Sequence, residues 1–251
     1  MNLTKIIVIT FLTSWIIFLW WCTQTQEKVN QPTQDVTVVA ISEYAVDPSD
    51  MVDATTLITP IAGSELSDFE KTGLIQMREE EKLARDVYMT LWAQRGKQIF
   101  GNIAQSEQTH TDAIKILLDR YSIADPVTSD AVGVFTSPVM QQLYTDLVQK
   151  GSTSLLDALI IGATVEDLDI KDLEELINTT DNQDIIAVYN NLNKWSRNHL
   201  RAYVKNITTE WWSYTPQYIP QSLYDSILAS AQERGNASGW WMGNGIGRWN
   251  R

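Results

Sequence analysis

Four segments of the chain place apolar side chains at every third or fourth position, and this spacing constrains the fold more than any other feature. Residues three and four apart lie on one face of a helix, so each segment predicts a helix with one apolar face. Ser67 and Glu70 have the spacing of a capping box at the start of the first segment. The segments are residues 67–96, 98–121, 154–177 and 183–207. The sequence therefore predicts an all-α fold in which four long helices bury their apolar faces against one another.

Two shorter helices are predicted outside these four. Residues 122–137 contain proline and glycine and predict a loop. Pro138, a favoured residue at the first helical position, then starts a helix that ends near Gly151. Residues 221–234 predict a short helix packed on the long ones. The second pair of long helices is thus separated from the first pair by a long connection.

Ionisable side chains interrupt the apolar faces of all four long helices. The chain has 2 histidines, and both lie within these faces. A carboxylate in a helical core is costly unless it is paired, protonated or bound to a metal. Glu79 and Glu80 are expected to lie mostly on other faces of the first helix. The side chains on the apolar faces are Glu81, Glu107, His110, Glu166, Asp169 and His199. They indicate either a metal site or a buried hydrogen-bonded polar network.

The types of residue and their spacing favour the metal site. Glu107 and His110 are three positions apart, so both can reach one ion from the same helix face. Carboxylate and imidazole ligands together suit iron, manganese or zinc. Four-helix bundles build dinuclear sites from inward-facing glutamates and Glu-x-x-His motifs. The carboxylates whose charge would balance two divalent ions are Glu81, Glu107, Glu166 and Asp169.

Three runs of sequence resemble ferritin-like proteins. Glu81–Tyr88 (EKLARDVY), within the longer run 79–88 (EEEKLARDVY), is similar to the first-helix motif of the rubrerythrin type, and Glu107–His110 matches its Glu-x-x-His motif. With residues 106–113 (SEQTHTDA) and 196–203 (SRNHLRAY), they resemble most closely an uncharacterised prokaryotic family, domain of unknown function family 2202.

This resemblance implies a fold and a cofactor. The fold is a ferritin-like four-helix bundle over residues 66–208, with residues 122–153 as its long crossover connection. The cofactor is iron or manganese in a di-metal carboxylate site.

One position departs from the ferritin-like pattern, which has a second Glu-x-x-His motif on its fourth helix. Ser196 occupies the place of that glutamate, whereas His199 is retained. Asp169 or Asp167 could supply the missing carboxylate. We therefore expect the second cation to be held more weakly than the first. A single bound metal, or zinc instead of iron, are the open alternatives. Changing Ser196 to glutamate is expected to complete the pair.

Residues 1–23 predict a signal peptide or a membrane anchor. Lys5 precedes the apolar run Ile6–Trp21, which is long for a signal core and short for a full membrane span. Cys22 leaves a lipidated terminus as a further alternative. Residues 24–65 contain several prolines and no helical period, and they predict an extended linker. The helical part is therefore expected outside the cytoplasm, either secreted or attached to a membrane.

Residues 209–251 predict an irregular extension around one short helix. Its tryptophans are Trp211, Trp212, Trp240, Trp241 and Trp249. Such a cluster could dock on a surface partner or pack against the helices. The net charge of −12 argues against nucleic acid as a partner.

Two functions fit these patterns. The first is an extracytoplasmic metal-binding protein, with an oxidoreductase acting on peroxide, oxygen or metal ions as its enzymatic form. The alternative is a non-catalytic bundle that serves as a cell-surface binding module. The metal content of the protein separates the two.

Overall fold

The computed structural model describes residues 65–233, and within this range it contains α-helices and no strand. The helices are α2 (Asp68–Arg95), α3 (Gln98–Arg120), α4 (Pro138–Gly151), α5 (Leu155–Ile177), α6 (Gln183–Thr209) and α7 (Gln221–Ala229). The predicted all-α class is confirmed for these residues. The signal peptide or anchor expected in residues 1–23, the linker and the last three tryptophans lie outside the described range.

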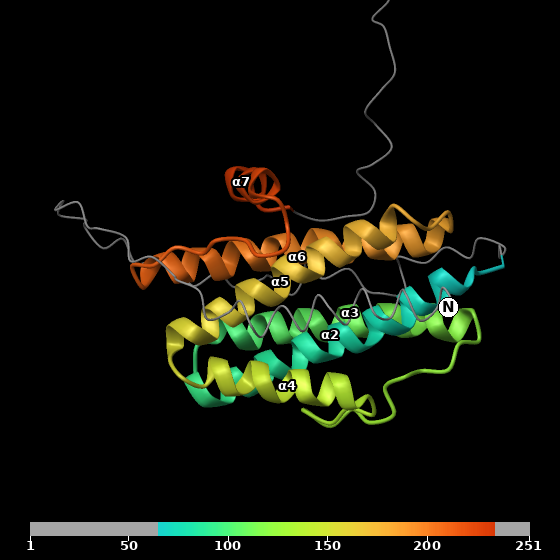
Figure 1. Ribbon diagram of the computed structural model, residues 1–251, viewed down its shortest axis with the longest axis horizontal. Coiled ribbons are helices and arrows are strands. Elements are labelled where there is room, and N and C mark those ends of the chain that lie inside the picture. The colour runs from blue at the N-terminus through green and yellow to red at the C-terminus, as the bar shows by residue number, and fades with distance from the viewer. Residues whose placement is uncertain (1–64, 234–251) are drawn as a thin grey trace, which may run out of the picture.

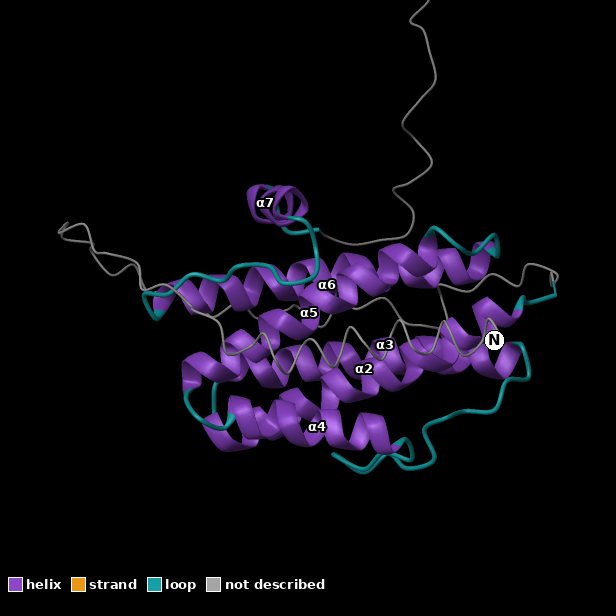
Figure 2. Ribbon diagram, viewed as in Figure 1, coloured by secondary structure: helices purple, strands orange, loops and turns teal. Residues whose placement is uncertain are grey.

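The four long helices form two hairpins that lie against each other (Figure 1). Gly96, in the left-handed conformation with φ of 65°, ends α2, and α3 begins two residues later. Only glycine adopts this conformation without strain, so Gly96 permits the tight reversal. Helices α5 and α6 form the second hairpin, and α2 packs on α5 while α3 packs on α6. The connection between the hairpins carries α4, which lies against α2 and α5 (Figure 2).

Glu70 ties the start of the first hairpin to the turn of the second. Its Oε2 accepts a hydrogen bond from the backbone N of Ser67 at 2.8 Å, which confirms the capping box. Its Oε1 accepts from the hydroxyl of Thr180 at 2.5 Å and from the amide of Asn182. One buried carboxylate therefore joins two chain segments, the start of α2 and the turn before α6.

A buried cation holds the connecting loop against α2. The ammonium of Lys82 is 2.5 Å from Asp86 and donates to the carbonyls of Ala131 and Val134 at 3.2 and 3.1 Å. Its charge and its donors are thus satisfied although the side chain is only 1% exposed.

The expected end of the last helix is wrong. Helix α7 stops at Ala229, not near Arg234, because Ser230 is extended and the chain returns to α6. There Glu233 accepts from Nε of Arg197 at 2.7 Å, and its backbone N donates to Asn198 at 3.0 Å. These contacts replace the last helical turn.

The interior consists of two apolar clusters with polar residues between them. One cluster includes Val87, Phe100 and Tyr203, and the other includes Leu74 and Leu117. On α2, α3, α5 and α6 the predicted ligands lie between residues of one cluster and residues of the other. The polar layer is therefore enclosed by apolar packing along both directions of the helices.

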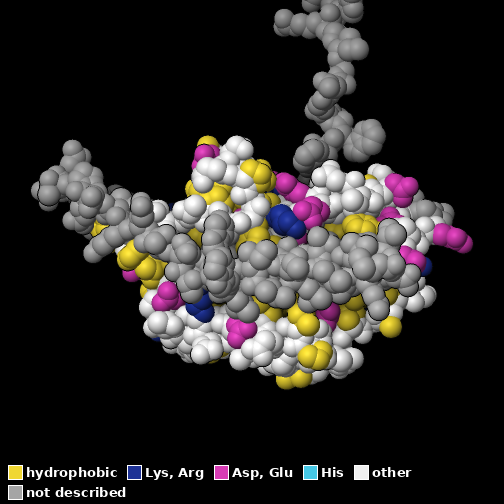
Figure 3. All heavy atoms as spheres, in the orientation of Figure 1, with side chains coloured by type: hydrophobic (Ala, Val, Ile, Leu, Met, Phe, Trp, Pro, Cys, Tyr) yellow, Lys and Arg dark blue, Asp and Glu magenta, His cyan; other side chains and the backbone are white. Residues whose placement is uncertain are grey.

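On the visible part of the face that Figure 3 displays, charged side chains do not gather into one acidic or basic patch. Figure 3 shows acidic side chains scattered over this face among polar and apolar ones. Within residues 65–233, no helix combines the length and the apolar character that crossing a membrane requires.

Candidate metal centre

The first group of possible ligands belongs entirely to the α2–α3 hairpin. Nδ1 of His110 lies 2.7 Å from Oε2 of Glu107 and 3.2 Å from Oε2 of Glu81. All three side chains are 2% exposed. One ligand atom from each lies within 4.8 Å of the other two, so the group could hold one metal ion.

The second group shares Glu107 with the first. Nδ1 of His199 lies 2.8 Å from Oε1 of Glu107 and 3.3 Å from Oε2 of Glu166. These three atoms also lie within 4.8 Å of one another. Because the two oxygens of Glu107 face the two histidines, this carboxylate stands between two adjoining groups, each able to hold a cation.

Several buried atoms in these groups have no hydrogen-bond partner among the described residues. They include Oε1 of Glu81 and Nε2 of His110, whereas Oε1 of Glu107 and Nδ1 of His199 face each other at 2.8 Å without the geometry of a hydrogen bond. Leaving a buried polar atom unpaired costs about 1–3 kcal/mol, and more for a charged group. A fully satisfied polar network, the alternative to a metal site, would not leave Oε1 of Glu81 and Nε2 of His110 unpaired.

The titration behaviour shows that the cluster attracts positive charge. Burial opposes ionisation, yet the charges of His110 and His199 lower the pKa of Glu107. Burial disfavours the imidazolium, yet the carboxylates of Glu166 and Glu107 raise the pKa of His199 to about 9, and those of Glu107 and Glu81 raise the pKa of His110. Burial also raises the pKa of Glu81 and of Glu166, so without a metal protons on the imidazoles and on these carboxyls together reduce the negative charge of the cluster.

Two neighbours orient the second group. The hydroxyl of Tyr88 donates to Oε1 of Glu166 at 2.7 Å, which leaves Oε2 facing His199. Nε2 of His199 lies 3.0 Å from the hydroxyl of Ser106, which leaves Nδ1 facing the carboxylates. Partners of this kind fix the orientation of ligands. The contact of Ser106 with His199 was not predicted, because Ser106 lies one position away from the apolar face of α3.

The structure places the two proposed substitutes for the missing carboxylate differently. Asp169 on α5 accepts a hydrogen bond from the hydroxyl of Ser196 and lies beside the two groups, without belonging to either. Asp167 is wrong as a candidate. It accepts from the hydroxyl of Tyr214 at 2.8 Å and from the backbone N of Ile219 at 3.0 Å, and so anchors the segment after α6.

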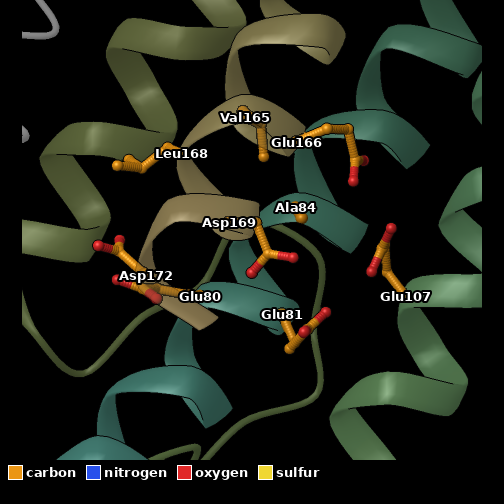
Figure 4. Close-up of a pocket in the computed structure, with 9 residues that line it drawn as sticks. All are labelled: Glu80, Glu81, Ala84, Glu107, Val165, Glu166, Leu168, Asp169 and Asp172. Carbon is orange, nitrogen blue, oxygen red and sulfur yellow. The ribbon is translucent and has the colours of Figure 1, made fainter. Parts of the chain in front are cut away.

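Two further carboxylates lie near the cluster. Glu80 and Asp172 line the same cavity as Glu81 and Asp169 (Figure 4). The expectation that Glu80 lies on another face is wrong, since it is 7% exposed. Asp172 could have been found, because it continues the three-residue spacing from Glu166 through Asp169.

These features define an all-helical protein with a buried carboxylate–histidine cluster that could bind metal ions. Residues 70–231 match the model of a family described as an uncharacterized protein domain, DUF2202, and the chain belongs to this family. The resemblance to that family is thereby confirmed.

A relative and a solved structure carry the same name. The uncharacterized protein MJ0754 of Methanocaldococcus jannaschii is 56% identical over 178 residues, which cover 71% of this chain and 96% of that protein. The crystal structure of hypothetical protein MJ0754 from Methanococcus jannaschii matches with a TM-score of 0.68 and 55% identity, over 70% of this chain and 100% of that chain.

Proposed function

We propose that this protein is a ferritin-like four-helix bundle that binds two divalent metal ions between its hairpins. The order of helices supports the proposal: α2 and α3, a long connection that carries α4, then α5 and α6. Ferritin-like folds join two hairpins by such a connection and place their ligands on inward faces.

The position of Glu107 between the two histidines is the observation that carries the proposal. In an octahedral site, two neighbouring ligand atoms bound to the ion at about 2.1 Å lie about 3 Å apart. In a tetrahedral site with bonds of that length they lie about 3.4 Å apart. The four separations of histidine nitrogens from carboxylate oxygens are 2.7, 3.2, 2.8 and 3.3 Å. These separations fit ligand atoms around two adjoining ions, and metal titration distinguishes such sites from hydrogen bonds of the same length.

The ferritin-like resemblance favours iron or manganese as the bound ion, with zinc as an alternative. Carboxylates and imidazoles suit all three ions. Glu81, Glu107 and His110 would hold the first ion, and Glu107, Glu166 and His199 the second. Asp169 would add a fourth carboxylate charge to the pair from its place beside Ser196.

A redox-active ion bound there would supply electron exchange with peroxide, oxygen or another metal ion. The side chains of the protein itself would hold the ion and orient its ligands. Tyr88 fixes one oxygen of Glu166, and Ser106 fixes the ring of His199. The apolar clusters above and below the polar layer limit access of water. The resulting low polarity strengthens every charge interaction within the site.

The place of action proposed here is outside the cytoplasm. Its support is the apolar run before the predicted linker. As a signal peptide this run would be cleaved off and release the helical part, and as an anchor it would attach that part to a membrane. A binding module is the second candidate function. Trp211 favours it, because this side chain is 53% exposed at the start of the tryptophan-rich extension.

Elemental analysis and metal titration of the full chain test the proposal. We expect up to two equivalents of iron or manganese, and Glu107→Gln should weaken the binding of both. Asp112→Asn is the control, since Asp112 is exposed on the same helix. A folded full chain that binds no metal would rule out the metal site and favour the binding module.

A further inference from the structure

A small cavity adjoins the proposed metal centre, and its polar lining consists of carboxylates. They come from α2, α3 and α5: Glu80, Glu81, Glu107, Glu166, Asp169 and Asp172. The cavity has a volume of about 10 Å³. A volume of this size holds about one water molecule, and thus a single ion without its hydration shell.

The cavity has an inner and an outer part. Its inner part is formed by Glu81, Glu107 and Glu166, the carboxylates of the proposed metal centre. Asp169 is only partly buried, whereas the other residues of the lining are buried. The cavity therefore approaches solvent at Asp169. In the view of Figure 4, Asp169 lies between Glu81 and the pair formed by Glu80 and Asp172.

An unpaired atom at the inner end points to a cationic occupant. Oε1 of Glu81 is buried and lacks a hydrogen-bond partner, and Glu81 lines the cavity. The outer carboxylates do have partners. Glu80 accepts from the amide of Gln76 at 2.9 Å, and Asp172 accepts from Lys171 at 2.9 Å. Ser196 donates to Asp169. These contacts hold the three carboxylates at the end of the cavity away from Glu107 (Figure 4).

We propose that Glu80, Asp169 and Asp172 form an acidic inlet through which divalent cations reach the buried centre. The inference rests on the proposed function, because the inlet needs a site to supply. A hydrated ion does not fit the cavity, so the outer carboxylates replace its water molecules one after another as it enters. Clefts lined by one sign of charge raise the rate of association of the opposite charge about 10- to 1,000-fold.

Lys171 is a cation that contacts the lining of the cavity through Asp172. Its ammonium lies 2.9 Å from Asp172 and 3.0 Å from Glu175, and Glu175 does not line the cavity. An entering ion therefore competes with Lys171 for Asp172. This competition makes Asp172 a transient ligand, not a resident one.

The test measures how fast and how tightly the full chain takes up Co²⁺, using the absorption of the bound ion in a rapid-mixing experiment. Glu80→Gln and Asp172→Asn, singly and together, remove charge from the inlet and keep the shape of the side chain. Glu79→Gln is the matched control, since Glu79 is the neighbouring glutamate on α2 and does not line the cavity. We expect association and dissociation to slow by the same factor, about tenfold or more, with unchanged stoichiometry and affinity.

Three results overturn the inlet while the metal centre stands. The first is Co²⁺ uptake by the inlet variants as fast as by the unmodified chain, and the second is equal slowing in Glu79→Gln. The third is loss of binding capacity in an inlet variant, which would make Glu80 or Asp172 a resident ligand. If the double variant does not fold, as judged by circular dichroism, the single variants decide by the same criteria. Failure of the unmodified chain to bind Co²⁺, Mn²⁺ or Fe²⁺ would instead overturn the proposed function, and the inlet with it.

Discussion

The hydroxyl of Ser196 on α6 donates a hydrogen bond to Oδ2 of Asp169 on α5. Ser196 is fully buried, so its small side chain leaves the room that the carboxylate of Asp169 occupies. In the ferritin-like pattern a glutamate precedes the second histidine by one helical turn. Here a carboxylate from the neighbouring helix reaches the place where that glutamate would begin.

A two-residue exchange tests whether Asp169 substitutes for the missing glutamate. Ser196→Glu alone adds volume and a second charge beside Asp169, so we expect the free energy of unfolding to fall by about 1–3 kcal/mol. Ser196→Glu combined with Asp169→Ser returns the carboxylate to α6 and should restore stability and bind two cations. Denaturant unfolding and Mn²⁺ titration measure both effects. The simpler expectation, that Ser196→Glu alone completes the pair, stays a prediction, and it would be the correct one if that variant were stable and bound the second ion more tightly.

The sharing of Glu107 predicts an asymmetry between variants of the glutamates. Glu81→Gln should weaken one equivalent of bound Mn²⁺ about 100-fold or more, since loss even of an orienting partner costs 10- to 100-fold. Glu166→Gln should weaken the other equivalent, and Glu107→Gln both. Calorimetric titration of the full chain resolves the two equivalents. The sharing would be refuted if Glu81→Gln and Glu107→Gln gave the same isotherm.

The hydroxyl of Tyr88 is predicted to matter at one ion only. Tyr88→Phe removes the 2.7 Å hydrogen bond to Glu166, so the ion held by His199 should bind about 10- to 100-fold more weakly. Tyr189→Phe is the matched control, because the hydroxyl of Tyr189 is also buried but has no hydrogen-bond partner among the described residues. Equal effects of the two substitutions on metal titration would show that Tyr88 acts only through packing.

Glu70 predicts how stability depends on acid pH. Although burial opposes ionisation, hydrogen bonds from Thr180, Asn182 and Ser67 lower the pKa of Glu70 from 4.5 to about 2. A carboxyl group whose pKa is lower in the folded state than in the unfolded state stabilises the fold at pH values above its unfolded pKa. This contribution is lost as the pH falls from about 4.5 to about 2. Glu70→Gln should therefore lower the free energy of unfolding at pH 7 by about 1–2 kcal/mol.

The same variant should differ less from the unmodified chain as the pH falls through that window. Denaturant unfolding at pH 7, 4 and 3 provides the comparison. A difference that stays constant with pH would mean that the charge of Glu70 does not contribute.

Removal of residues 1–65 tests the predicted division of the chain. Helices α2 to α7 bury their own apolar clusters, so the remainder should be monodisperse and largely helical by circular dichroism. Its thermal midpoint should lie within a few degrees of that of the full chain. Aggregation of the shortened protein would show that the segment before Leu66 belongs to the core.

Local signals predicted the helices because each signal depends on a few neighbouring residues. Ser67 with Glu70, Gly96 and Pro138 mark helix ends through hydrogen bonds and backbone angles within one turn, and the structure has the ends there. The end of α7 was predicted wrongly because it depends on Glu233 meeting α6, a contact between distant parts of the chain.

The same distinction applies to the proposed site. Periodicity predicted that Glu81, Glu107, His110, Glu166 and His199 face inward, and all five are buried. It could not show that Glu107 lies between the two histidines, nor that Asp167 anchors the segment after α6, because both depend on how the hairpins are rotated. Lys82 and Glu80 are buried against the rule that charged residues are exposed. Lys82 donates to carbonyls distant in sequence, which local patterns cannot show, whereas Glu80 accepts from Gln76 one turn before it.

The two groups of ligands also differ in when they can form. Glu81 and His110 are 29 positions apart, and the first group is complete once α2 pairs with α3. The second group needs α5 and α6 to dock on that hairpin. If the first group binds an ion as proposed, the α2–α3 hairpin alone would capture it during synthesis, before α5 and α6 have emerged. Its charge would then lie on the exposed face of the hairpin and attract Glu166 as the second hairpin closes over it, so that the cation guides assembly of the protein that encloses it.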